Sequence, residues 1–253
     1  RHFYFLLLCF ALVTFAHGGF LENQERYNKT FVEQNPSGNI TLTRRQLFTS
    51  CSFPDSGTHN LDGDCSLSSV KHITTGTFAL TGPVGILKKV QAPTNDKIFM
   101  VNWSGGGQNG NLVATNVHFL GGSSSFGGAI IIGQTSSSSF SNCIFENNVG
   151  DMDGGALYIG ISSGSVTLKS CLFKNNRAGP SDWSGCAAGS KCNGAAIYAD
   201  IPAGAVITLI DLTFANNDIK YEEVYIKGDG TKNLVNYFGN VARRVSRSVN
   251  NFV

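Results

Sequence analysis

Charged residues make up only 14% of this 253-residue chain, and they nearly cancel to a formal net charge of +2. Such a chain has no strong electrostatic field to attract nucleic acid or acidic substrates, so we expect no nucleic-acid partner. Proline is also scarce, with six residues, whereas glycine is abundant, with thirty. Many turns without proline breaks favour β-structure over helices, and the Ser, Thr, Val, Ile and Phe content agrees.

Beyond its N-terminus the sequence has no apolar run long enough to span a bilayer. The N-terminus itself has a short run, Phe3 to Phe15, preceded by basic residues and followed by Ala16-His17-Gly18. This layout is typical of a signal peptide cleaved near Gly18; a retained anchor or a buried helix is the alternative. We therefore expect a secreted, extracellular or cell-surface protein with no membrane span in the mature chain.

The cysteines agree with export to an oxidising compartment. Removing Cys9 with the signal peptide leaves six of the seven cysteines. Cys51 and Cys65 flank a turn rich in Gly, Asp and Ser, and Cys186 and Cys192 flank the short loop CAAGSKC. We predict that each of these two pairs forms a local disulfide.

Three Asn-X-Ser/Thr triplets are eligible for N-glycosylation, which is a modification of exported proteins. They begin at Asn28, Asn39 and Asn102. If the source is eukaryotic, these triplets predict a glycoprotein.

A Phe-X-Asn-Asn pattern recurs along the chain as FENN, FKNN and FANN. It begins at Phe145, Phe173 and Phe214, and Phe119 continues the same column upstream. The intervals between these residues are 26, 28 and 41, and the longest contains an insertion at 178–192. Without the insertion the period is about 27 residues, which indicates an internal structural repeat.

Each repeat contains polar positions that predict turns between short strands. Alternation of apolar residues breaks three positions before each Phe and then resumes, and the position is occupied by Asn, Ser or Asp. These residue types tolerate left-handed backbone angles, so they predict sharp bends. The asparagines that we assign to turns are Asn116, Asn142, Asn147, Asn148, Asn175, Asn176, Asn216 and Asn217.

Small-residue triplets form a second series, GGA, GGA and GAA, and each opens an apolar strand. The series degrades at 97–101 and at 222–226, as capping coils of a solenoid do. Three short strands and three turns per repeat fit one coil of a parallel β-helix; an antiparallel sandwich is the alternative. In a β-helix the Phe column and the cysteines Cys143 and Cys171 stack inside, and the two cysteines are either thiols or a disulfide.

FENN, FKNN and FANN, paired with GGAI, GGAL and GAAI, resemble the FxxN and GGA[ILV] motifs of the polymorphic outer membrane protein repeat family. The resemblance covers roughly Asn111 to Ile226. It implies a right-handed single-stranded parallel β-helix of the pectin-lyase-like superfold. It also implies surface display and adhesion.

The predicted organisation of the all-β chain has four parts. They are a signal peptide at 1–18, an N-terminal cap or joint at 19–39, a β-helix at 40–232 and a C-terminal tail or cap at 233–253. The clearest repeats lie at 97–226, with degenerate capping coils outside them. The insertion at 178–192 is predicted to be a disulfide-stapled loop.

No set of residues in the sequence predicts catalysis, a metal site or a cofactor. The best acidic candidates, Asp151 and Asp153, precede a small-residue triplet and are predicted to lie in a solvated turn. Trp183, in the stapled insertion, is the aromatic residue that we expect to contact a ligand, because loops that leave a solenoid often carry function.

These patterns favour a structural or adhesive β-helix protein that acts by surface display or by self-assembly into a coat or fibre. The expected partners are copies of itself, other extracellular structural subunits, and glycans. The alternatives are a polysaccharide lyase or hydrolase, for which converging carboxylates would be required, and a glycan-binding module that uses Trp183.

Overall fold

The computed structural model describes residues 28–34, 40–46, 48–103, 109–182, 184–186, 192–219, 222–235 and 238–239. The chain divides into two compact units, Arg1–Phe48 and Thr49–Val253. In the first unit, β1 (Asn28–Gln34) pairs with β2 (Ile40–Gln46) in an antiparallel hairpin. This pairing corrects the predicted start of the solenoid at residue 40, because the coils of a β-helix stack through parallel strands. The predicted signal peptide lies outside the described residues.

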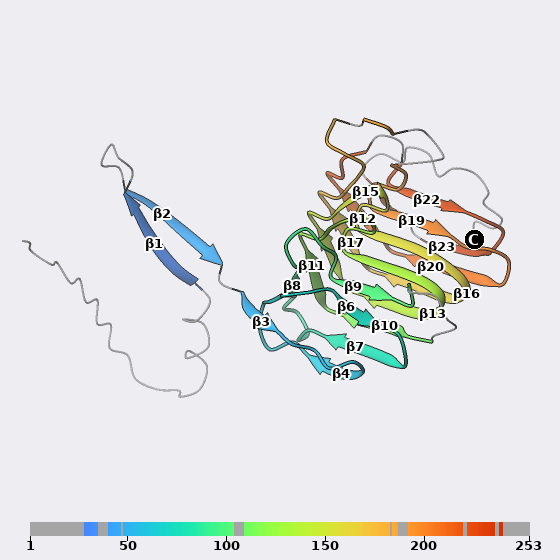
Figure 1. Cartoon of the computed structure of the whole chain (residues 1–253), viewed down its shortest axis with the longest axis horizontal. Coiled ribbons are helices and arrows are strands. Elements are labelled where there is room, and N and C mark those ends of the chain that lie inside the picture. Colours follow the sequence, from blue (N-terminus) through green and yellow to red (C-terminus); the bar gives the residue numbers. More distant parts are fainter. Residues whose placement is uncertain are drawn as a thin grey trace, which may run out of the picture. The chain divides into compact units, whose positions relative to one another are not determined.

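The second unit is an all-β solenoid of three parallel sheets, as the repeat predicts (Figure 1). Among the described residues, the largest sheet contains eleven strands, which stack in two neighbouring columns that share the two longest strands, Ile130–Ser141 and Leu157–Lys169. They are β4 (Gly57–Asn60), β6 (Lys71–Ile73), β7 (Thr77–Thr81), β9 (Phe99–Val101), β10 (Asn111–Thr115), β13 (Ile130–Ser141), β16 (Leu157–Lys169), β19 (Ile197–Asp200), β20 (Ala205–Ile210), β22 (Val224–Lys227) and β23 (Thr231–Val235).

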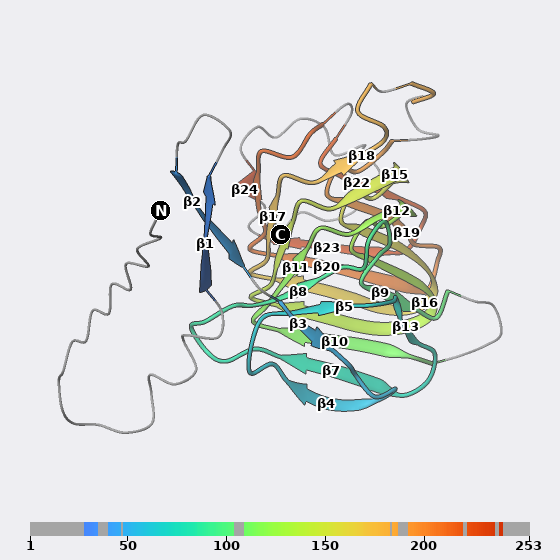
Figure 2. The same cartoon turned by 60° about the vertical axis from the view of Figure 1, so that its left-hand side comes forward.

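A second sheet of the described chain contains eight strands, and a third contains three. The second consists of β3 (Thr49–Cys51), β5 (Cys65–Leu67), β8 (Lys88–Gln91), β11 (Val117–Leu120), β14 (Ile144–Glu146), β17 (Leu172–Lys174), β21 (Thr213–Ala215) and β24 (Phe238–Gly239). The third, seen in Figure 2, consists of β12 (Ser123–Phe126), β15 (Val149–Asp153) and β18 (Arg177–Ala178). Because β23 and β24 pair in parallel with strands of the preceding coil, the solenoid continues past its predicted end at residue 232.

A sharp bend joins the largest sheet to the second sheet in successive coils. The backbone at the bend is left-handed, with φ of 58° at Asn116, 52° at Asn142, 53° at Ser170 and 52° at Asp211. Asn and Asp tolerate this conformation better than most residues because their short polar side chains bond locally to the backbone. The polar residues at this position of the repeat therefore form the bend between the two sheets.

The paired asparagines of the repeat have two different roles. The first members, Asn147, Asn175 and Asn216, are exposed and have φ between 53° and 56°. The second members are buried and form a column that we call the asparagine ladder: Asn148, Asn176 and Asn217. The turn prediction is thus incomplete for the second members, since their side chains bond to one another along the solenoid.

The core contains a stack of phenylalanines, one from each of four successive coils. Phe119, Phe145, Phe173 and Phe214 are almost fully buried. The ring centroids of Phe145 and Phe173 lie 4.8 Å apart with an interplanar angle of 4°, and those of Phe173 and Phe214 lie 5.4 Å apart at 15°. Parallel strand pairing puts identical residues directly opposite one another, so one repeated Phe becomes a continuous aromatic column.

Candidate functional site

A column of three tyrosines lies on the outside of the solenoid. Tyr158 of β16, Tyr198 of β19 and Tyr225 of β22 occupy the same register position in successive coils. Their sequence neighbours on both sides belong to the hydrophobic core, so alternation along each strand directs the tyrosines away from it. Tyr158 and Tyr225 are half-buried, whereas Tyr198 between them is only 5% exposed. The ring centroids lie 4.8 Å apart for the first pair and 5.4 Å apart for the second, with interplanar angles of 15° and 17°.

Two further aromatic residues extend this column, and the five together are called the tyrosine face: Trp103, Phe126, Tyr158, Tyr198 and Tyr225. Phe126 comes from the third sheet, and its ring centroid lies 5.1 Å from that of Tyr158. The Trp103 ring lies 5.4 Å from Tyr158, nearly perpendicular to it at 86°.

Two glycines make room for the indole of Trp103, which is 40% exposed. A Cβ atom added at Gly133 would come within 2.9 Å of Trp103 Cε3. One added at Gly160 would lie 3.5 Å from Trp103 Cζ3 and 3.1 Å from Tyr158 Cε1. The six-membered ring of the indole therefore lies over a strip of sheet that carries no side chain.

Charged groups border the tyrosine face at its C-terminal end. Lys227 Nζ lies 2.9 Å from Asp200 Oδ2 and 5.6 Å from the centroid of the Tyr198 ring. Interaction with the Tyr198 hydroxyl and with Asp200 raises the pKa of Lys227, so it remains a cation. Burial raises the pKa of Tyr158 to about 12, so its hydroxyl stays protonated at neutral pH and can donate a hydrogen bond.

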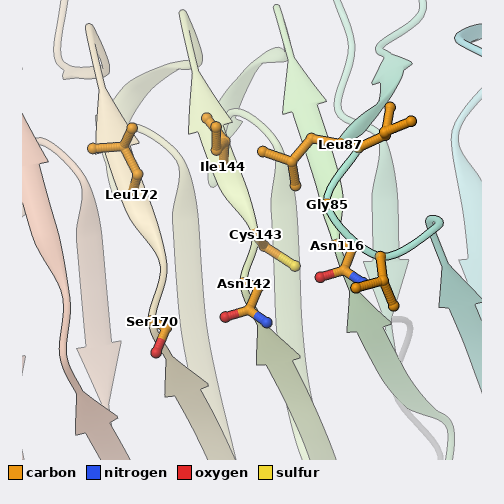
Figure 3. A pocket seen from close by; sticks show the side chains of 10 residues that line it. Gly85, Leu87, Asn116, Asn142, Cys143, Ile144, Ser170 and Leu172 are labelled. Atoms are coloured by element: carbon orange, nitrogen blue, oxygen red, sulfur yellow. The ribbon is translucent and has the colours of Figure 1, made fainter.

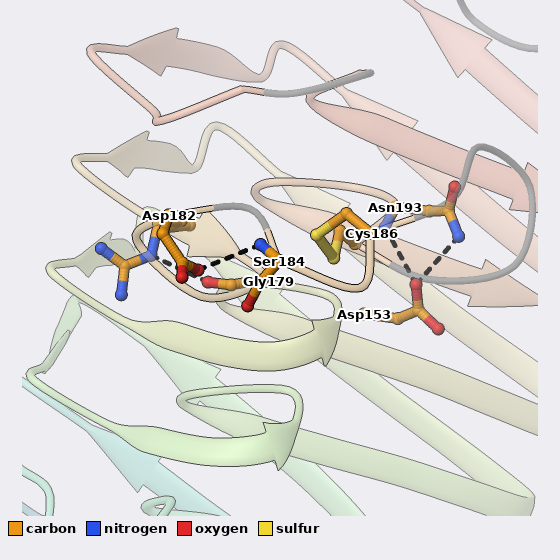
Figure 4. Close-up of a disulfide and its surroundings, with 8 residues drawn as sticks. Asp153, Gly179, Asp182, Ser184, Cys186 and Asn193 are labelled. Carbon is orange, nitrogen blue, oxygen red and sulfur yellow. Dashed lines mark hydrogen bonds between the residues drawn. A yellow bond between two sulfur atoms is a disulfide. The ribbon is translucent and has the colours of Figure 1, made fainter.

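Two more carboxylates lie near this end of the face. Asp153 is only 6% exposed, and its Oδ1 accepts hydrogen bonds at 2.9 Å from both the peptide nitrogen and Nδ2 of Asn193 (Figure 4). Burial raises the pKa of Asp153. Burial, and then the charge of Asp153, raise the pKa of Glu222.

The position of Asp153 corrects the prediction of a solvated turn at Asp151 and Asp153. Asp151 is exposed, but both residues belong to strand β15, and Asp153 is buried at its end. The sequence places Asp153 beside Gly154 and so suggests a turn, whereas its bonding partner Asn193 is forty positions away and is found only in the folded chain.

Both predicted disulfides are present. Cys51 joins Cys65, and Cys186 joins Cys192 in the insertion (Figure 4). Cys143 and Cys171 are free, buried thiols, which decides between the two alternatives that the sequence left open. Burial raises the pKa of the Cys143 thiol well above its usual range.

The remaining predicted site residues have different outcomes. Trp183 and Asn39 lie outside the described residues, and Asn28 lies in β1. Asn102 is 1% exposed, and its Nδ2 donates to the carbonyls of Gly110 and Thr135. A glycan on Asn102 is incompatible with this packing, so the glycosylation prediction for that sequon is corrected.

An apolar groove lies elsewhere on the solenoid, beside the loop that carries Val84 and Leu87 (Figure 3). Its volume is about 390 Å³, and Val84 at its edge is 92% exposed. The described lining also includes Cys143, Ile144 and Leu172 and contains no acidic or basic side chain. The groove offers apolar contact but no acid–base chemistry.

The sequence reasoning missed the tyrosine face, although a signal for it was present. Tyrosine is the third residue of ALYIG, AIYAD and EVYIK, which come from three successive coils. Phe126 and Trp103 carry no such signal, because the fold alone brings them to Tyr158.

Within the described residues, no three His, Cys, Asp or Glu side chains come together as a metal site. The part of the chain that the structure describes also has no helix with the length and apolar character needed to cross a membrane.

Comparison with protein families finds the Chlamydia polymorphic membrane protein repeat, whose model matches residues 142–160 and 170–200. The match confirms the resemblance expected from the FxxN and GGA motifs, and these segments lie in the parallel solenoid. No curated protein and no solved structure matches the chain.

Proposed function

We propose that this chain, which carries Chlamydia polymorphic membrane protein repeats, is a secreted or cell-surface structural and adhesive protein. It acts by presenting the tyrosine face to a partner rather than by catalysis. The observation that carries the proposal is the exposed Trp103 beside a stacked tyrosine column whose end members, Tyr158 and Tyr225, are half-buried and whose middle member, Tyr198, is 5% exposed. Tyrosine and tryptophan supply large contact area with a polar handle, which is why they are frequent in binding surfaces.

The scaffold behind this face supports such a role. The strands that carry the tyrosines are held on their inner side by core residues; β16 and β19 have parallel neighbours on both edges, and β22 has one on a single edge. A face built on packed strands holds its side chains at fixed spacing, and little conformational entropy is lost when a ligand binds.

The name of the matched repeat supports placement at a cell surface, because it describes a membrane protein of Chlamydia. The test is immunogold labelling of intact and of permeabilised cells that express the chain. Label on intact cells is expected; label that appears only after permeabilisation would reject a surface location.

Adhesion is tested with fluorescent beads coated with the folded chain and counted on intact cultured cells. A Tyr158→Ser, Tyr225→Ser double variant should lower the number of retained beads about fivefold or more, since it removes two anchors of the face. The matched control is Thr167→Ala, Thr208→Ala, which alters half-buried residues on another part of the largest sheet. Equal retention by all three proteins would reject the tyrosine face as the adhesive surface.

Self-assembly is a second part of the proposal. Among the described strands, β22 and β23 each pair with a neighbour on one side only, and open strand edges favour association. Sedimentation velocity should show a different assembly state when residues 240–253 are deleted. An unchanged sedimentation profile would show that the C-terminal end of the solenoid is not the surface through which copies associate.

Catalysis on a polysaccharide is the competing function, and one observation favours it. The pKa values of Asp153 and Glu222 are both raised, as in a carboxylic acid that donates a proton. The test is an assay for reducing ends released from a neutral polysaccharide by the chain and by its Asp153→Asn variant. Activity that this substitution abolishes would establish an enzyme and reject the adhesive proposal.

A further inference from the structure

We propose that the tyrosine face binds a chain of neutral pyranose sugars, with Trp103 as the stacking platform and Asp200 and Lys227 as hydrogen-bonding partners. The inference rests on the proposed function, because it names the ligand class of the same face.

Trp103 has the features of a stacking platform. Its indole is 40% exposed and perpendicular to Tyr158, and it lies over Gly133 and Gly160. Because contact with Tyr158 and the sheet limits its movement, the indole is held in place before a ligand arrives. The C–H face of a pyranose ring is apolar and flat, so it gains dispersion and hydrophobic contact on such a surface.

Hydrogen-bonding groups continue the strip on which the indole lies. Gly133, Gly160, Asp200 and Lys227 occupy one register column in four successive coils. The indole covers the two glycines, and the carboxylate and ammonium groups follow in the next two coils. A sugar hydroxyl both donates and accepts hydrogen bonds, so it can donate to Asp200 and accept from Lys227.

The tyrosine hydroxyls provide a repeating edge beside this column. Adjacent strands repeat about every 4.8 Å, so Tyr158, Tyr198 and Tyr225 place a phenol at each of three rungs. Tyr198 is only 5% exposed and its hydroxyl interacts with Lys227, so the half-buried Tyr158 and Tyr225, two coils apart, offer their edges and hydroxyl groups to a ligand. A polymer whose hydroxyl groups recur along its length matches such a row better than a compact ligand does.

The balance of charge selects neutral sugars over acidic ones. Asp153, Asp200 and Glu222 are three carboxylates near the C-terminal end of the face, and the neighbouring cation, Lys227, is already paired with Asp200. A uronate or sulfated sugar would meet net negative charge there, and like-charge repulsion acts as a filter on specificity.

The test uses calorimetry on the full chain with hexasaccharides of glucose, mannose and N-acetylglucosamine, and with polygalacturonate as the acidic probe. At least one neutral hexasaccharide should bind, and Trp103→Ala should weaken its binding about tenfold or more, since the aromatic stacking platform is lost. Lys227→Met should weaken it as well, through the loss of a donor. The matched control is Leu87→Ala, which truncates an exposed apolar side chain at the groove elsewhere on the solenoid and should leave affinity unchanged.

Unfolding midpoints of all variants are measured first, so that loss of binding is not mistaken for loss of folding. Tighter binding of polygalacturonate than of every neutral sugar would overturn the inference. If no sugar binds while bead adhesion still depends on the tyrosines, the inference fails and the proposed function stands. If bead adhesion is also independent of the tyrosines, both fail.

Discussion

Asn148 and Asn176 lie in adjacent coils, and both the peptide nitrogen and Nδ2 of Asn148 donate to Oδ1 of Asn176 at 3.0 Å. The same arrangement recurs between Asn176 and Asn217, at 2.9 and 3.0 Å. A single amide oxygen thus satisfies a backbone donor and a side-chain donor in a place that water does not reach.

Replacing the middle member of the ladder, Asn176→Ala, should lower the free energy of unfolding by about 2–5 kcal/mol, because two buried donors of Asn148 lose their acceptor. Urea denaturation followed by circular dichroism measures the change. The control is Asn175→Gly at the neighbouring exposed position, where φ is 54°; glycine adopts this angle readily, so the change should stay within about 0.5 kcal/mol. Similar losses in both variants would show that the ladder has no special role.

Truncating one member of the phenylalanine column, Phe145→Ala, should cost about 3–5 kcal/mol, because the ring is fully buried between two others and its removal leaves a cavity. The adjacent Ile144 is only half-buried at the edge of the groove, so Ile144→Ala should cost less than about 1.5 kcal/mol. The same urea series gives both values. A larger loss for Ile144 than for Phe145 would contradict the assignment of the core.

Stability should fall as the pH drops below about 6.5, the unfolded pKa of histidine, because burial lowers the pKa of His118 in the folded chain. Because the pKa of His118 is lower in the folded state, the imidazole binds a proton more readily when the chain is unfolded. Its contribution to the free energy of unfolding is therefore complete above pH 6.5 and is lost as the pH falls below that value. The slope from this residue is at most about 1.4 kcal/mol per pH unit. The neighbouring carboxylate Glu146 has a lowered pKa and therefore acts at more acidic pH.

The measurement is the free energy of unfolding between pH 8 and pH 5 for the natural chain and for His118→Leu. The difference between the two curves should be steepest just below pH 6.5. Parallel curves would mean that His118 titrates equally in both states.

The thiols of Cys143 and Cys171 should resist alkylation in the folded protein, because both are buried and burial keeps the Cys143 thiol protonated. Iodoacetamide followed by peptide mass spectrometry should find neither modified under native conditions and both modified after unfolding without reductant. The four bonded cysteines should remain unmodified in both samples. A peptide that joins Cys143 to Cys171 would contradict the free-thiol assignment.

Much of the fold follows from the repeat, and the reason is geometric. One coil stacks on the next through parallel strands, so residues one period apart must lie opposite each other. The repeat period therefore predicts that Phe145, Phe173 and Phe214 stack. The left-handed bends at Asn116 and Asn142 follow from residue type, because few residues tolerate that conformation. The start of the solenoid cannot be predicted in this way, because the side chains of β2 alternate in the same manner whether its partner strand is parallel or antiparallel.

The candidate site was less accessible to sequence reasoning. The tyrosine column obeys the same period as the core, but a residue that points outward looks like any surface residue until its neighbours are known. The sequence predicts a solvent-exposed turn at Asp153, because no residue near it in the sequence is a hydrogen-bonding partner. Its partner, Asn193, lies beyond the insertion.

The period, the strand alternation, the bends and the local disulfides can all be predicted from the sequence, because each depends on residue type and short-range spacing. Folding is needed to show that Asn148 and its equivalents form a ladder, that Asn102 is enclosed, and that Trp103 and Phe126 contact Tyr158. These contacts join residues from different coils at unequal spacing. Their existence depends on how loops of different lengths return the chain to the same face, and residue type alone does not specify that.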